Sequence, residues 1–188
     1  HAILFKTCSK LKANHLQAKL FCSHAARVSV LTLSYAAAQP EPVEISLSRW
    51  GSRNLWRWYS QIMPAPEKGL DGTASAVEGN RTYITQELNG THFCVGLHAV
   101  INGSFSAECP TVHEAKLTAA AVGEHQMTVY YNVSLGATCE EAKDACDAAL
   151  NAAIGSGEDA LYAGHRDAWA EFWNRSYAAV EDDYQENL

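Results

Sequence analysis

Apolar and polar residues alternate in short runs over residues 1–135, which is the pattern of β-strands with a buried face. In residues 27–35 the apolar positions change face after Val30, which indicates either a strand covered on both faces or a β-bulge at the switch. Short strands at regular spacing predict an antiparallel β-sandwich. Its expected strands are residues 1–8, 17–22, 27–35, 43–50, 82–88, 92–101, 104–109, 114–122 and 126–135.

Turn signals separate these runs. Pro40-Glu41-Pro42 and Gly123-Glu124 are expected to end strands, because proline cannot donate to a ladder and Gly-containing dipeptides favour turns. Asn89-Gly90 and Asn102-Gly103 are hairpin dipeptides. Residues 60–80 hold two prolines and three glycines with little periodicity, so we expect a long loop there.

After Gly136 the period becomes helical. Thr138 and Glu141 have the spacing of a capping box, and the alanine-rich residues 139–153 that follow favour a helix. Gly155-Ser156-Gly157 is expected to end that helix, and a second helix should follow with an apolar stripe. The sequence therefore predicts a mainly β fold with a sandwich domain at residues 1–135 and a two-helix appendage at residues 136–188.

Composition limits the possible classes of protein. With 47% hydrophobic residues the chain can bury a core. It has no run of about 20 apolar residues, so we expect no membrane span. The formal net charge is −7, with −9 in residues 136–188 and +2 in the remainder. The sequence has no basic stripe, so we expect no nucleic-acid partner. Because the sequence starts at His1 within a strand pattern, we expect a processed product or a piece of a longer polypeptide.

Five N-x-[S/T] sequons point to an extracellular, N-glycosylated protein, because each match alone is weak but five in 188 residues exceed chance. Two of them coincide with the turn dipeptides, where a glycan would find an exposed backbone. The candidate glycosylation sites are Asn80, Asn89, Asn102, Asn132 and Asn174.

The six cysteines are an even number and suit an oxidising compartment, where 15 disulfide connectivities are open. Cys139 and Cys146 would lie about 10 Å apart on a helix, too far for one bridge. Proximity alone suggests Cys8–Cys22 and Cys94–Cys109, and buried free thiols are the alternative. The disulfide candidates are Cys8, Cys22, Cys94, Cys109, Cys139 and Cys146.

Two aromatic segments are candidate binding elements. Residues 165–177 place aromatic rings on one stripe of the second helix, and we expect them to dock on the sandwich rather than to bind a ligand. Residues 50–59 could stack on a sugar or could pack at a strand corner. The side chains concerned are His165, Trp169, Phe172 and Trp173 in the helix, and Arg53, Trp56, Trp58 and Tyr59 in the cluster.

Catalytic and metal motifs are not apparent in the sequence. Asp167 and Glu171 lie one helical turn apart but off the aromatic stripe, which is typical of a solvated face. The eight histidines have no metal-ligand spacing, and His92 and His98 would lie about 20 Å apart on a strand. We therefore expect no metal, no cofactor and no catalytic residue in this chain.

The pattern H-x-x-x-W-x-x-F-W-x-x-S after an acidic helix resembles the linker region of glycoside hydrolase family 95-like proteins, which include α-L-fucosidases. Residues 25–34, Pro42-Val43 and Ser48-Arg49-Trp50 resemble the sandwich strands of that family more loosely. The resemblance implies a supersandwich-like N-terminal β-sandwich joined by a linker helix to an (α/α)6 barrel that carries the catalytic carboxylates downstream. The residues that match are His165, Trp169, Phe172, Trp173, Asn174, Arg175 and Ser176.

Three functions remain open at this point. The resemblance implies the non-catalytic N-terminal module of a secreted carbohydrate-active protein, whose partner is a downstream catalytic domain. A structural extracellular glycoprotein could instead self-assemble through strand edges or the aromatic helix. A lectin-like module that binds carbohydrate would rest on the Arg53–Tyr59 cluster alone.

Overall fold

The computed structural model describes residues 13–48, 73–88, 90–101 and 103–175. Within these residues the chain forms seven strands and then two helices. The elements are β1 (Ala13–Ser23), β2 (Val28–Ser48), β3 (Ala74–Glu78), β4 (Arg81–Leu88), β5 (Thr91–Ile101), β6 (Phe105–Thr111), β7 (Glu114–Gly136), α1 (Cys139–Ser156) and α2 (Glu158–Arg175).

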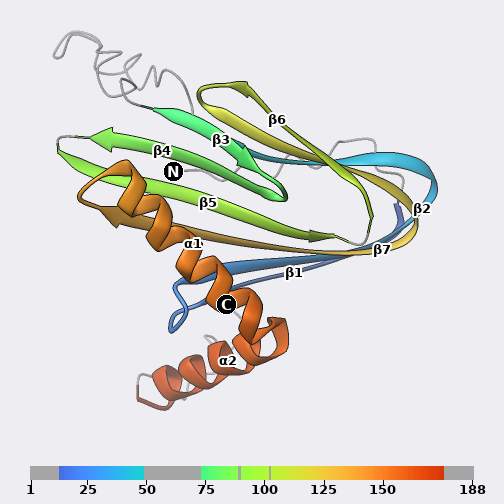
Figure 1. Ribbon diagram of the computed structural model, residues 1–188. Coiled ribbons are helices and arrows are strands. Elements are labelled where there is room, and N and C mark those ends of the chain that lie inside the picture. Colours follow the sequence, from blue (N-terminus) through green and yellow to red (C-terminus); the bar gives the residue numbers. More distant parts are fainter. Residues whose placement is uncertain (1–12, 49–72, 89, 102, 176–188) are drawn as a thin grey trace, which may run out of the picture.

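All the strand pairs are antiparallel, in the order β1-β2-β7-β5-β4-β3, with β6 added alongside β7. The two longest strands, β2 and β7, pair along most of their length and bend together (Figure 1). The bend turns the sheet back on itself, and the Ser75 hydroxyl of β3 donates to the Thr111 carbonyl of β6 at 2.6 Å. The predicted mainly antiparallel β fold with two C-terminal helices is confirmed.

Among the described residues, the two largest apolar clusters lie on opposite faces of the sheet. The inner core lies between the layers and includes Leu31, Leu33 and Val129. The outer core lies between the sheet and the helices and includes Val28 and Val30. The change of apolar face after Val30 therefore marks a strand covered on both faces. No register shift occurs at this point, so the β-bulge alternative is wrong.

Both expected interruptions of the long strands are crossed by continuous strand. Between Ala37 and Glu41 a register shift absorbs the proline segment, because a bulge tolerates a residue that cannot donate to the ladder. On β7, Gly123 pairs with Ala37 and the strand continues. The expected loop at residues 60–80 was also wrong in part, since β3 lies within it. The expected strand at residues 1–8 lies outside the described residues.

The start of α1 follows the predicted capping box. Thr138 accepts a hydrogen bond from the Glu141 amide at 3.1 Å, and the Glu141 carboxylate accepts from the Ala137 amide at 2.9 Å. Gly136 permits this abrupt turn from β7, because a Cβ there would lie 2.5 Å from the Ala142 nitrogen. The helix continues to Ser156, and Gly157 follows with a φ of 79°, which glycine adopts without strain.

Candidate functional site

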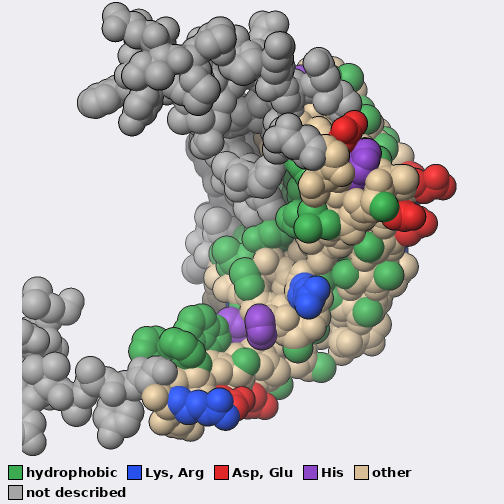
Figure 2. Space-filling model, turned by 90° about the vertical axis from the view of Figure 1, so that its left-hand side faces the viewer, with side chains coloured by type: hydrophobic (Ala, Val, Ile, Leu, Met, Phe, Trp, Pro, Cys, Tyr) green, Lys and Arg blue, Asp and Glu red, His purple; other side chains and the backbone are tan. Residues whose placement is uncertain are grey.

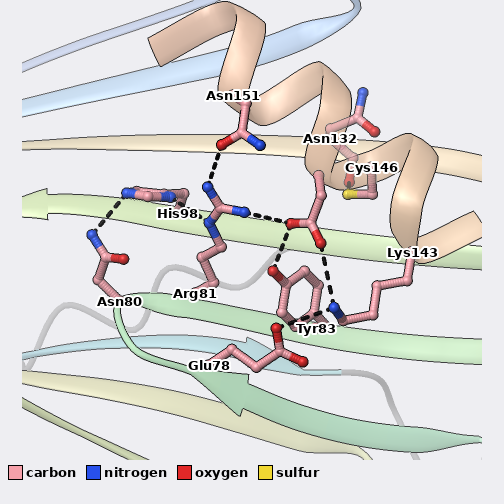
Figure 3. A network of polar contacts seen from close by, with 10 residues as sticks. Glu78, Asn80, Arg81, Tyr83, His98, Asn132, Lys143, Cys146 and Asn151 are labelled. Carbon is pink, nitrogen blue, oxygen red and sulfur yellow. Dashed lines mark hydrogen bonds and ion pairs between the residues drawn. The ribbon is translucent and has the colours of Figure 1, made fainter. Parts of the chain in front are cut away.

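A polar network fastens α1 to β4 along one margin of the outer core (Figure 3). The Asp147 carboxylate of α1 lies at its centre. It accepts from Arg81 at 2.7 Å and from the Tyr83 hydroxyl at 2.6 Å, both on β4. Lys143, one turn earlier on α1, donates to Asp147 at 3.3 Å and to Glu78 of β3 at 3.1 Å. The network thus joins α1 to β4 directly through Asp147, and to β3 through Lys143.

His98 of β5 extends the network away from the helix. Its Nδ1 atom accepts from Arg81 Nε at 2.8 Å, and its Nε2 atom lies 2.7 Å from the Asn80 side-chain amide. Asn80 also donates to the Ala99 carbonyl at 2.9 Å, and Arg81 contacts Asn151 of α1 as well. Because Nδ1 accepts from a permanent cation, the imidazole is held in its neutral form.

The pKa shifts show which charge state the network favours. Burial lowers the pKa of His98, and the adjacent Arg81 charge lowers it further. Burial alone would raise the pKa of Asp147. Hydrogen bonds from Tyr83 and Lys143, together with the charges of Lys143 and Arg81, outweigh burial and lower it. Burial and the hydrogen bond to Asp147 raise the pKa of Tyr83.

This arrangement suits positioning rather than proton transfer. An acid or base catalyst needs a carboxyl or imidazole whose pKa lies near the working pH, and both Asp147 and His98 are shifted away from it. This network was not predicted from the sequence. The four-residue spacing of Lys143 and Asp147 was a signal for a helical ion pair, but the strand partners come from the tertiary fold.

The first half of α2 docks on β1. Leu161 is buried, and Tyr162 and His165 pack against Phe21 with ring centroids at 5.2 and 5.5 Å. His165 Nδ1 donates to the Cys22 carbonyl at 2.8 Å. The Lys19 ammonium lies 3.6 Å from the centroid of the Tyr162 ring, a cation–π contact.

The second half of α2 carries an exposed aromatic face, which we define as Trp169, Phe172 and Trp173. These side chains are 48%, 51% and 56% exposed, and their rings contact one another with centroids 5.2–6.1 Å apart. Figure 2 shows hydrophobic side chains gathered at the lower end of the molecule, over α2. The expected docking on the sandwich is therefore found for His165, but not for the other three residues.

The two carboxylates noted on α2, Asp167 and Glu171, are exposed, and Glu171 pairs with Arg175 one turn along the helix. They form the solvated face that the sequence predicted. Among the described residues, no group of three or more His, Cys, Asp or Glu side chains could hold a metal ion. None of the described helices combines the length and apolar character needed to cross a bilayer.

The sequon asparagines differ in their surroundings. Asn132 is 3% exposed, its amide donates to the Arg27 carbonyl at 2.7 Å, and its oxygen accepts from Ser134 at 2.5 Å. This site has no room for a glycan in the folded chain. Asn80 is half-buried within the polar network, whereas Asn174 is exposed on α2. Asn89 and Asn102 lie outside the described residues.

The five described cysteines are free thiols. The suggested Cys94–Cys109 pairing is not formed, because Cys94 is buried beneath α1 whereas Cys109 is exposed on β6. Cys8 lies outside the described residues, so the Cys8–Cys22 suggestion stays a prediction. The residues proposed for glycan contact, Arg53, Trp56, Trp58 and Tyr59, also lie outside the described residues.

Comparison with known proteins gives a likeness of fold. No protein-family model matches the sequence, and no curated protein matches it. Among solved structures, one titled "Putative kojibiose phosphorylase from human microbiome" matches with a TM-score of 0.60 at 9% identity. The match covers 84% of this chain and 21% of that one, so the chain spans about a fifth of the matched structure. The chain therefore shares its fold with part of a protein whose title describes a carbohydrate-active enzyme.

Proposed function

We propose that this chain is a non-catalytic β-sandwich module of a secreted carbohydrate-active enzyme, N-terminal to the catalytic domain. The resemblance of residues 165–176 to glycoside hydrolase family 95-like linkers and the likeness of fold to the phosphorylase structure support this role. The observation that carries it is the exposed aromatic face of α2, which leaves three large rings in solvent. In this proposal the face packs against the catalytic domain.

The polar network fits this role as a support for the helices. Because Asp147 ties α1 to β4, the helix cannot swing away from the sheet without breaking several charged hydrogen bonds. Leu161 and His165 then fix the start of α2 against β1. The sandwich thereby presents the aromatic face in one orientation, which reduces the conformational entropy lost when it docks.

Hydroxyl-radical footprinting of side chains tests this proposal. The natural polypeptide should contain more than the 20.5 kDa of this chain, with helical repeats after Leu188. Trp169 and Trp173 should be oxidised readily in the isolated chain and protected in the natural polypeptide. Met127, which is buried in the inner core, should be protected in both and serves as the control. A longer natural polypeptide whose tryptophans remain equally reactive would contradict the docking role.

Self-assembly is a second candidate function, favoured by the same exposed aromatic face. In that case the isolated chain should form ordered oligomers, and protection of Trp169 and Trp173 should rise with protein concentration. The double variant Trp169→Ala, Trp173→Ala should dissociate these oligomers into monomers, whereas Asp167→Asn on the solvated face should leave them intact. Light scattering that finds a monomer at every concentration would rule this candidate out.

A lectin-like activity is the third candidate, and it depends on residues 50–59. It predicts that the chain binds an oligosaccharide array and that Trp56→Ala and Trp58→Ala abolish the binding. Tyr162→Phe, on the outer core, should leave such binding intact and is the matched control. An array without any bound glycan would remove this candidate and leave the first two.

A further inference from the structure

A thiol and an imidazole from distant parts of the chain meet where α1 begins. Cys139 is the first residue of α1, and His92 lies near the start of β5. The Cys139 sulfur lies 3.4 Å from His92 Nδ1, which is within hydrogen-bonding distance for sulfur. Both residues are half-buried, so each keeps part of its surface in solvent. A nucleophile and a base in such contact are the two groups that nucleophilic chemistry at sulfur needs.

The tertiary fold holds this pair together. His92 pairs with Gly136 on β7, and α1 turns back over the sheet from the end of that strand (Figure 1). A side chain at Gly136 would collide with the first turn of the helix, because its Cβ would lie 2.5 Å from the Ala142 nitrogen. The bare glycine therefore lets this turn, and Cys139 with it, come down beside His92.

The other described cysteines have different surroundings and serve as internal comparisons. Cys22 and Cys109 are exposed, on β1 and β6 respectively. The Cys22 sulfur lies 3.0 Å from the Ser29 hydroxyl, which does not take up a proton near neutral pH. Cys94 and Cys146 are buried in the outer core. Exposure alone would therefore make Cys22 and Cys109 the most reactive of the described thiols.

The charges next to the pair are acidic. Glu140 follows Cys139 in the chain and is exposed. Glu87 on β4 pairs with His92, so the two side chains lie on the same face of the sheet, and Glu87 is exposed as well. Lys143, one turn further along α1, is already held in two ion pairs. These surroundings favour the approach of a cationic reagent over that of an anionic one.

We propose that Cys139 is a site of thiol–disulfide exchange with small cationic disulfides, with His92 as the base. The thiol proton passes to His92 Nδ1 while the Cys139 sulfur attacks one sulfur of the reagent. The S–S bond of the reagent breaks as the new S–S bond to Cys139 forms, and the departing thiolate takes the proton from the imidazolium. One thiol and one disulfide thus become a mixed disulfide on Cys139 and a free thiol, without a further oxidant.

Timed labelling of the reduced, folded chain tests this proposal. The chain is treated with cystamine, quenched with acid, blocked with N-ethylmaleimide and digested without reductant, and the modified fraction of each cysteine is measured by mass spectrometry. We expect Cys139 to react about tenfold faster than Cys22 and Cys109, although these two are more exposed. A Cys139 rate equal to or below theirs would overturn the proposal.

A change of reagent tests the preference for a cation. Relative to Cys22, Cys139 should react about threefold faster with cationic cystamine than with anionic oxidised glutathione. High salt should reduce this preference, because it screens exposed charges, and Glu87→Gln should reduce it because one carboxylate is lost. The same reagent preference at Cys139 and Cys22 would contradict the assignment to cationic disulfides.

Substitution of the base separates its role from simple exposure of the thiol. His92→Gln keeps a hydrogen-bonding side chain but cannot take up the proton, so it should lower the Cys139 rate about tenfold and leave the Cys22 rate unchanged. His24→Gln, at an exposed position between β1 and β2, should leave the Cys139 rate unchanged. The two buried cysteines of the outer core should stay unlabelled in every folded variant, so their labelling reports unfolding.

An unchanged Cys139 rate in folded His92→Gln protein would overturn the role of His92. If that variant does not fold, the rates of the three thiols in the unmodified chain still decide. The outcome is independent of whether α2 docks on a catalytic domain, because the thiol and the imidazole both belong to the sheet and the start of α1.

Discussion

The Arg81 guanidinium on β4 lies 2.7 Å from the Asp147 carboxylate on α1, 66 residues later in the chain. Neither partner is fully buried, since their side chains are 20% and 21% exposed. An isolated pair at such a site contributes little to stability. Here the same carboxylate also accepts from Tyr83 and Lys143, so the four groups act as one network that positions the helix.

Loss of this carboxylate should weaken the attachment of α1. We expect Asp147→Ala to lower the free energy of unfolding by about 2–3 kcal/mol, because it leaves the Tyr83 hydroxyl and the Arg81 charge without their partner. Asp144→Ala, at an exposed position on the same helix, should change it by less than about 0.5 kcal/mol. Urea unfolding followed by circular dichroism measures both, and equal effects would show that the network is not important for stability.

Acid should destabilise the fold through His98. Because its folded-state pKa lies below the unfolded value of about 6.5, its contribution is fully present above pH 6.5 and declines as the pH falls toward the folded value. His98→Gln should remove this part of the pH dependence, whereas His24→Gln at an exposed position should retain it. Melting temperatures at a series of pH values between 7.5 and about 4.5 check the prediction.

A second acid step should come from Asp147. Its folded-state pKa is lowered, so its contribution is present above the unfolded value of about 3.9 and is lost as the pH falls through the folded value. Asp147→Asn should therefore flatten the stability profile below about pH 4 but leave the His98 step visible. A profile below pH 4 that is unchanged in this variant would contradict the assignment.

Gly96 should tolerate no side chain. We expect Gly96→Ala to lower the free energy of unfolding by about 1–3 kcal/mol, because the added Cβ would lie 2.5 Å from Cys146 Sγ and 3.3 Å from Leu150. Gly155→Ala is the matched control, since nothing lies within 4 Å of its Cβ position near the end of α1. That change should stabilise the chain by up to about 1 kcal/mol through helix propensity, as thermal unfolding would show.

Glycan mapping should distinguish two of the sequons. Asn174→Gln should remove one glycan from the protein secreted by a eukaryotic host, because Asn174 is exposed on α2. Asn132→Gln should remove none and should destabilise the fold by about 1–3 kcal/mol, because it disturbs the buried hydrogen bond to the Arg27 carbonyl. Intact mass before and after enzymatic deglycosylation gives the result. A glycan on Asn132 in folded protein would contradict the buried placement.

Local sequence patterns were sufficient to predict most of the described strands and helices. The alternation at Val43, Ile45 and Leu47 predicted a strand with one buried face, and all three side chains are buried. Thr138 and Glu141 predicted the start of α1 to the residue. The strand ends expected at the proline segment and at Gly123 were wrong, because the pairing of β2 with β7 on both sides of the bulge outweighs the local turn preference.

By itself the sequence determined the antiparallel β fold, the two C-terminal helices and the acidic character of the helical segment, because periodicity, capping and charge are properties of neighbouring residues. Only the tertiary structure decided that Asp147 meets Arg81, that Cys146 lies directly over Gly96, and that the aromatic face of α2 stays in solvent. These relationships depend on how α1 and α2 pack across strands far away in sequence. That packing follows from the register and bend of the whole sheet, and a local pattern does not contain it.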